Sequence, residues 1–220
     1  MKIGKLLIAL TATMLLASSA AAQNNFNYPK PYVQLAGLYA ACNLNGFNAP
    51  GDCSDNFDSS FGFNFRGGAR LNRWFAVEGQ VEWVSGFDAT SKGIATFNEI
   101  DPGLGLTSAS VDSVAYTINA RLYLTEGRIQ PYAIAGIGGQ NSWLDTNLGN
   151  SDTFTSFIGR FGAGVDLYLT ENLALTGEFT YVAATEATAR YYDWYNVWTT
   201  SSGIDPSYMA VSWGLLYSFY

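Results

Sequence analysis

Eight charged residues lie in stretches that otherwise carry few charges, and those within one stretch are separated by an even number of positions. These residues could form a buried electrostatic network. Four are arginines and four are acids: Arg66, Arg70, Glu78, Glu82, Arg121, Arg160, Asp166 and Glu178. Arginine and carboxylate groups form strong, bidentate, hydrogen-bonded ion pairs. A closed interior needs such a balanced set, because an unpaired buried charge is costly. We therefore expect these eight side chains to share one interior.

Two interpretations of this interior network are open. The functional one is a gate or narrow ion path in which an arginine exchanges acidic partners. The structural one is a plug of ion pairs that holds the surrounding protein together. We favour the plug, because the strand pattern given below predicts an eight-stranded barrel, and such a barrel leaves little open bore.

Catalytic chemistry is poorly supported by the composition. The 220-residue chain contains no histidine, and histidine is the commonest general base near neutral pH. It also has no glycine-rich phosphate-binding motif and no cysteine–histidine cluster with metal-ligand spacing. We expect no enzymatic activity, no cofactor, no metal site and no nucleic-acid partner.

The amino terminus has the pattern of a secretory signal peptide. Lys2 and Lys5 precede an apolar run at 6–16, and three alanines at 20–22 offer a small-residue cleavage site. We predict a signal peptide over residues 1–22 and one mature domain over 23–220. The alternative is an uncleaved membrane anchor, for which the apolar run is short.

The predicted export sets the redox environment of the only two cysteines, Cys42 and Cys53. An exported protein meets an oxidising compartment, so a disulfide that closes the loop between them is the favoured prediction. Two reduced, unreactive thiols are the alternative.

Eight segments alternate between apolar and polar residues, as strands do when one face is apolar. We expect strands at about 32–40, 61–71, 75–84, 113–124, 129–139, 155–169, 173–182 and 207–220. The fifth consists of small residues that do not determine its facing. The connections are short after the second, fourth and sixth strands (72–74, 125–128 and 170–172). They are long after the first, third, fifth and seventh (41–60, 85–112, 140–154 and 184–206).

The two faces of these strands distinguish a membrane barrel from a soluble one. The apolar faces carry many large aromatic side chains, including Phe63, Trp83, Phe161 and Trp213. Such side chains would overpack the interior of an eight-stranded barrel. Turned outward, they meet lipid and leave the eight charged residues inside. Connections sorted by length are also typical of outer-membrane barrels. We predict an all-β protein, an eight-stranded antiparallel up-and-down transmembrane β-barrel with polar side chains filling its lumen.

Three segments carry a resemblance to a known family: 67–79, 131–139 and the closing pattern Ser212-x-Gly214-x-x-Tyr217-x-Phe219, which Tyr220 follows. They resemble the second hairpin, the fifth strand and the assembly signal of the OmpA-type family of eight-stranded outer-membrane β-barrel proteins. The resemblance implies a Gram-negative outer-membrane location, with lipid, lipopolysaccharide and the barrel assembly machinery as partners. It also implies a role without catalysis, and we expect a monomer.

The long connections could contact a partner. They are acidic, and the last one carries Tyr191, Tyr192, Trp194, Tyr195 and Trp198. Aromatic residues are enriched at binding hot spots, which suggests contact with a host or matrix protein. They are also enriched at membrane interfaces. An equally open interpretation therefore extends the seventh and eighth strands past the membrane as a hairpin, with this segment at the lipid headgroups. We therefore expect a structural or adhesin-like surface role with a plugged lumen. A narrow low-conductance channel is the first alternative, and a soluble lipocalin-like carrier is the second.

Overall fold

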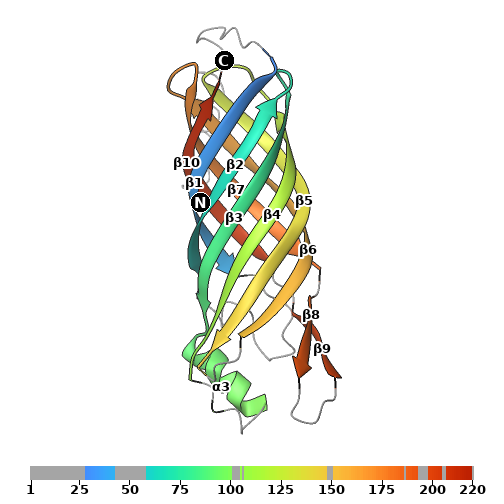
Figure 1. The fold of residues 1–220 in the computed structure, drawn as a ribbon. Helices are drawn as coiled ribbons and strands as arrows, with labels where there is room; N and C mark the ends of the chain where they lie inside the picture. Colours follow the sequence, from blue (N-terminus) through green and yellow to red (C-terminus); the bar gives the residue numbers. More distant parts are fainter. Residues whose placement is uncertain are drawn as a thin grey trace, which may run out of the picture.

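The computed structural model describes residues 28–42, 58–100, 105, 107–147, 151–185, 187–192, 198–204 and 207–219. Eight of the strands in this part of the chain close into an antiparallel barrel in the order β1-β10-β7-β6-β5-β4-β3-β2 (Figure 1). They are β1 (Lys30–Cys42), β2 (Ser60–Arg70), β3 (Phe75–Asp88), β4 (Ala109–Tyr123), β5 (Ile129–Thr146), β6 (Ser151–Tyr168), β7 (Leu173–Ala184) and β10 (Tyr208–Ser218). β10 pairs with β1 and closes the barrel. The predicted fold class is confirmed.

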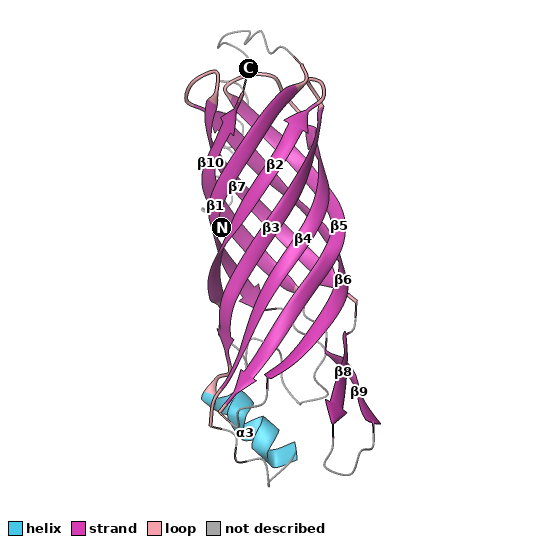
Figure 2. Ribbon diagram, in the orientation of Figure 1, coloured by secondary structure: helices cyan, strands magenta, loops and turns pink. Residues whose placement is uncertain are grey.

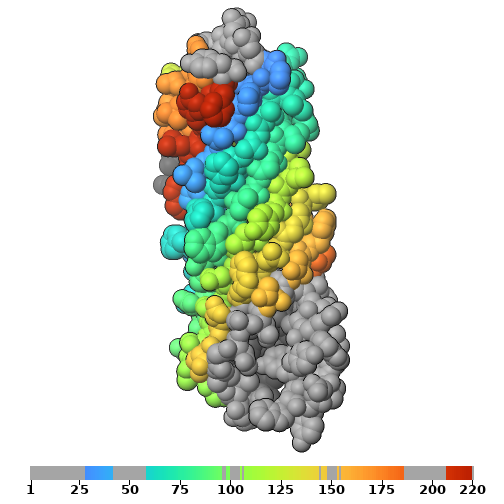
Figure 3. Space-filling view, viewed as in Figure 1, coloured from blue at the N-terminus to red at the C-terminus, as the bar shows by residue number. Residues whose placement is uncertain are grey.

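Alternation along each strand sorts its side chains between lipid and lumen. In β7, Leu175 and Phe179 point outward and are about half exposed, whereas Glu178 between them is buried. The same sorting places Trp213 and Leu215 of β10 on the outer wall. Figure 3 shows this wall, with β1 to β5 following one another as tilted bands from blue to yellow. A barrel with this apolar outer surface is stable only when lipid covers it.

β5 is the strand whose facing the amino-acid pattern left open. Its buried residues Gln130, Tyr132 and Ile134 point into the lumen, and Ile137 points outward with 62% of its surface exposed. β5 also extends well beyond the expected 129–139, and it pairs with β6 as far as Asp145 opposite Ser151. Polar residues beyond 139 can continue the strand because a long neighbouring strand satisfies their backbone groups.

The connections of unequal length lie at opposite ends of the barrel (Figure 2). The short turns lie at the end that holds the carboxyl terminus. At the other end are helix α3 (Ser91–Ile100) and a separate hairpin of β8 (Ala187–Tyr192) and β9 (Trp198–Ile204). For the position of α3 we expected only a long connection. For 184–206 we left open a contact loop or a hairpin that extends the seventh and eighth strands past the membrane. Thr90 begins α3 as its amino-terminal cap, with its hydroxyl oxygen accepting a hydrogen bond from the Gly93 amide at 3.1 Å.

The hairpin of β8 and β9 forms a two-stranded sheet of its own and does not extend the barrel strands. No helix in the described part of the chain is long and apolar enough to cross a membrane.

Candidate functional site

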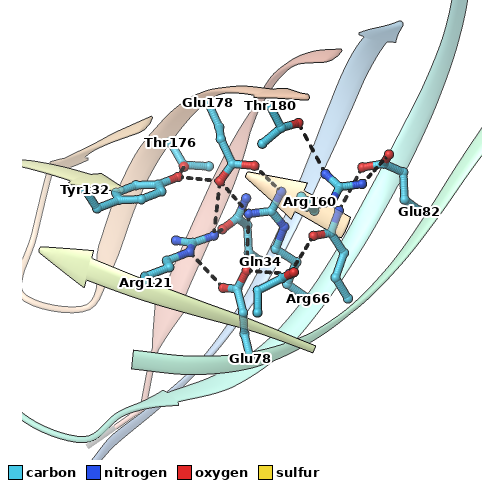
Figure 4. Close-up of polar contacts among 12 residues, drawn as sticks. Gln34, Arg66, Glu78, Glu82, Arg121, Tyr132, Arg160, Thr176, Glu178 and Thr180 are labelled. Carbon is cyan, nitrogen blue, oxygen red and sulfur yellow. Dashed lines mark hydrogen bonds and ion pairs between the residues drawn. The ribbon is translucent and has the colours of Figure 1, made fainter. Parts of the chain in front are cut away.

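The lumen is the best-defined candidate site, and a cluster of five charged residues lies at its centre. These residues are Arg66, Glu78, Arg121, Asp166 and Glu178, and we call them the central cluster. Figure 4 labels the two arginines and the two glutamates. Arg66 extends from β2 across the barrel to Glu178 on β7. Its two terminal nitrogens donate to the two carboxylate oxygens at 2.7 and 2.5 Å. The same side chain donates to Glu78 on β3 at 3.3 Å. Arg66 therefore ties opposite walls of the barrel together.

Arg121, on β4, is the second arginine of the central cluster. Its Nε lies 2.9 Å from Glu78 Oε2, and its terminal nitrogens lie 3.6 Å from Asp166 and 3.8 Å from Glu178. It also donates to Gln34 Oε1 on β1 at 2.6 Å. Two fully buried arginines thus face three buried carboxylates.

Tyrosine hydroxyls complete the surroundings of these carboxylates. Each carboxylate accepts one phenolic hydrogen bond: Glu78 from Tyr32 at 2.7 Å, Glu178 from Tyr132 at 2.9 Å and Asp166 from Tyr123 at 3.1 Å. The guanidinium of Arg121 also lies over the Tyr132 ring, 4.5 Å from its centre. These hydroxyls and ring faces help to stabilise a group of charges that is removed from water.

A second ion pair lies apart from the central cluster. Arg160 on β6 donates to Glu82 Oε1 on β3 at 2.6 Å. The same oxygen accepts from Tyr208 on β10 at 2.5 Å, and the other carboxylate oxygen accepts from Gln80 at 2.8 Å. Arg160 also donates to Thr180 at 3.3 Å. The ion pair and its hydrogen-bond partners thus connect four strands, β3, β6, β7 and β10.

Arg70 is the member of the predicted set that lies outside these ion pairs. It is buried near the short turns, where it donates to Gln130 Oε1 and to the Arg73 carbonyl, each at 2.5 Å. Its guanidinium lies 3.9 Å from the centre of the Tyr123 ring. The structure therefore places all eight predicted side chains inside the barrel, and seven of them form the ion pairs described above.

Apolar side chains fill the lumen on both sides of the charges. We call one group the loop-side cluster: Leu38, Ala40, Val84, Phe87, Ala115, Ile158, Val182, Tyr208 and Ala210. The other is the turn-side cluster: Tyr32, Ala76, Tyr123, Tyr132, Ile134, Tyr168, Ala174 and Leu216. Every named residue of both clusters is at most 5% exposed. The charged middle of the lumen is thus enclosed by packed, largely apolar layers.

The charge-based set of eight leaves out several uncharged lumen residues: Gln34, Gln80, Asn119, Gln130 and the interior tyrosines. Alternation places Gln34, Gln80 and Asn119 on the polar faces of their strands, and the structure confirms that facing. Gln130 lies in β5, whose facing the sequence did not determine. No signal in the linear sequence indicates which of them meet across the lumen.

The remaining predicted site residues lie elsewhere. Ser212 and Gly214 of β10 face the lumen, and Tyr217 and Phe219 face outward with their rings 5.3 Å apart. Tyr220 lies outside the described residues.

Cys42 ends β1, but its side chain and the whole of Cys53 lie outside the described residues, so the disulfide stays a prediction. The backbones of Tyr191, Tyr192 and Trp198 lie in β8 and β9, whereas their side chains, Trp194 and Tyr195 are outside the described part. Among the described residues, no group of three or more acidic, histidine or cysteine side chains could hold a metal ion.

Comparison with known proteins agrees with this geometry. Residues 8–219 match the family model described as the outer membrane protein beta-barrel domain. The chain belongs to this family. Its eight barrel strands are therefore transmembrane strands, and the protein is located in the outer membrane. Comparison with curated proteins finds no significant sequence match.

Solved structures show the same fold in this outer-membrane barrel. Neisserial surface protein A is 15% identical with a TM-score of 0.58, and the match covers 86% of this chain and 97% of that one. OprG from Pseudomonas aeruginosa is 13% identical with a TM-score of 0.60, covering 90% and 100%. AlkL, determined in lipid bilayers, is 14% identical with a TM-score of 0.56, covering 90% and 94%. At these identities the likeness concerns the fold alone.

Proposed function

We propose that this protein is a closed outer-membrane barrel with a structural and surface-interaction role and without enzymatic turnover. The observation that carries the proposal is the filled lumen. Seven charged residues pair inside it, and packed layers enclose them on both sides. An ion crossing this interior would have to displace side chains from partners that are themselves out of water, which is costly.

Electrical recording of the purified protein in a planar lipid bilayer tests the closed lumen. We expect no steady conductance. A large, steady conductance that is unchanged in the folded variants Arg66→Met and Glu82→Gln would refute the plug. It would favour the alternative, a narrow channel.

The end that carries the long connections supports the surface role. The short turns of outer-membrane barrels face the periplasm and the long loops face the outside. At the long-connection end, Asp58, Asp88 and Asp145 are exposed. Exposed acidic groups favour a partner that presents a basic surface, because charge complementarity steers association. We infer a basic host or matrix protein as that partner.

The aromatic segment between β8 and β9 is the proposed contact. Replacing Trp194 and Trp198 with alanine should reduce binding of protein-bearing cells to the partner surface and leave barrel stability unchanged. Trp74→Ala is the matched control, because Trp74 lies in a short turn at the opposite end. Unchanged adhesion in the double variant would reject the contact. Lowered barrel stability with unchanged adhesion would instead indicate a position at the lipid headgroups.

A further inference from the structure

β3 departs from regular alternation near its carboxyl end. Its pairing with β4 shifts register between Val84 and Phe87. Gly86, within this bulge, has a φ angle of +78°. A bulge inserts an extra residue and re-aims the side chains that follow it. Val84 and Phe87 are consequently both buried inside the barrel, although regular alternation would place Phe87 on the outer wall.

Side chains from both neighbouring strands hold the bulge. The Gly86 amide donates to Asp112 Oδ1 on β4 at 2.6 Å. On the other side, the Ser60 hydroxyl of β2 donates to the Ser85 carbonyl. A positive φ suits glycine and disfavours residues with a Cβ atom. The bulge is therefore an anchored feature of the wall.

Phe87 connects this bulge to a buried ion pair. Its ring packs against Tyr208, with 6.3 Å between the ring centres, and both belong to the loop-side cluster. The Tyr208 hydroxyl donates to Glu82, which is the partner of Arg160. The two aromatic rings thus cover the ion pair from the side of the long connections.

The wall beside these rings is polar. Ala115 of the loop-side cluster lies in register with Gln140 on β5, which is in register with Ser156 on β6. Buried side-chain oxygens of Ser113, Gln140 and Ser156 have no hydrogen-bond partner among the described residues. Buried polar atoms of this kind are usually satisfied by water. Once the rings move, water can wet this wall.

We propose that Phe87 and Tyr208 form an aromatic lid over the loop side of the lumen, latched by the bulge at Gly86. With the lid displaced, small hydrated ions reach the Glu82–Arg160 pair along the polar wall. This inference rests on the proposed closed lumen, and it assigns to Phe87 and Tyr208 the closure of the lumen at the end that carries the long connections.

Solvent access to the polar wall tests the proposal, because a displaced lid admits ions only as far as the Glu82–Arg160 pair and the central cluster still closes the lumen. The readout is the rate at which a small, positively charged thiol reagent modifies Ser156→Cys on this wall, in a background in which Cys42 and Cys53 are replaced by serine.

Asp112→Ala removes the acceptor of the Gly86 amide, whereas Asp112→Asn keeps an oxygen in that position. Loss of one hydrogen bond to a charged group should raise the modification rate about ten-fold or more in Asp112→Ala. Asp112→Asn should stay close to the protein with the natural Asp112. Phe87→Ala should be modified faster still, and Phe87→Leu more slowly than Phe87→Ala.

Phe65→Ala is the control for ring removal, because Phe65 faces outward and is 51% exposed. Heat-modifiable gel mobility selects the folded fraction of each variant before labelling. Phe87→Ala and Asp112→Ala in which the thiol is modified as slowly as in Phe65→Ala would overturn the lid and leave the closed barrel standing. Steady conductance of the natural protein in bilayer recording would instead refute the closed barrel itself.

Discussion

Arg66 should be a principal electrostatic tie across the barrel, and replacing it with methionine tests this. The side chain is fully buried and makes two short hydrogen bonds to Glu178 and one longer bond to Glu78. Methionine keeps much of the apolar stem but leaves the central cluster with one arginine and three carboxylates. We expect the folded barrel to lose stability.

The contacts of Arg66 determine the expected magnitude. A hydrogen bond between charged groups contributes about 1.5–3 kcal/mol, so the two bonds to Glu178 amount to about 3–6 kcal/mol. This agrees with the loss of about 3–5 kcal/mol typical when one partner of a buried ion pair is removed. Some of that loss is the desolvation penalty of the abandoned Glu178 carboxylate.

A double-mutant cycle separates the desolvation penalty of the Glu178 carboxylate from the loss of the Arg66–Glu178 ion pair. In Arg66→Met with Glu178→Gln, the neutral amide needs no counter-ion and can still accept the Tyr132 hydroxyl. The double variant should therefore lose less stability than the sum of the single variants, by about 1–3 kcal/mol. Denaturant unfolding in phospholipid vesicles, followed by tryptophan fluorescence, measures each free energy of unfolding.

The exposed pair of Arg73 and Glu126 provides the matched control. Their charged atoms lie 3.8 Å apart, with side chains 59% and 46% exposed. The same cycle on this pair should give a coupling of about 0.5 kcal/mol or less, because solvent screens it. A coupling this small at Arg66 and Glu178 would refute the reasoning that the buried pair ties the walls together.

Two further predictions concern packing and assembly. Gly164→Ala should destabilise the barrel by about 1–3 kcal/mol, because a Cβ atom would lie 2.5 Å from the Tyr132 ring. Gly177→Ala, with open space at its outward Cβ position, should have little effect in the same unfolding assay. Deleting Phe219 and Tyr220 should lower the folded yield in the outer membrane, since the Phe219 amide also donates to β1. Normal yield would overturn the assembly role of this terminus.

Alternation in the sequence was sufficient to predict the barrel and the facing of seven of its strands. Each strand repeats its environment every two residues, so an apolar face and a charged face are visible locally. Isolated exceptions such as Ile158 and Leu216 belong to the packed apolar clusters of the lumen. The facing of β5 was not predictable, because small side chains such as those of Ala133 and Gly136 suit either side of the wall.

The sequence by itself also determined that four arginines and four acids share the interior, since each lies on the polar face of its strand. Only the tertiary structure decided their partners. Arg66 meets Glu178 112 positions along the chain, whereas Arg70 donates to the uncharged Gln130. Which side chains meet across a lumen depends on strand tilt and on the register at closure, and neither is a local property of the chain. The bulge that turns Phe87 inward is likewise not a local property of β3, because side chains from the two neighbouring strands hold it.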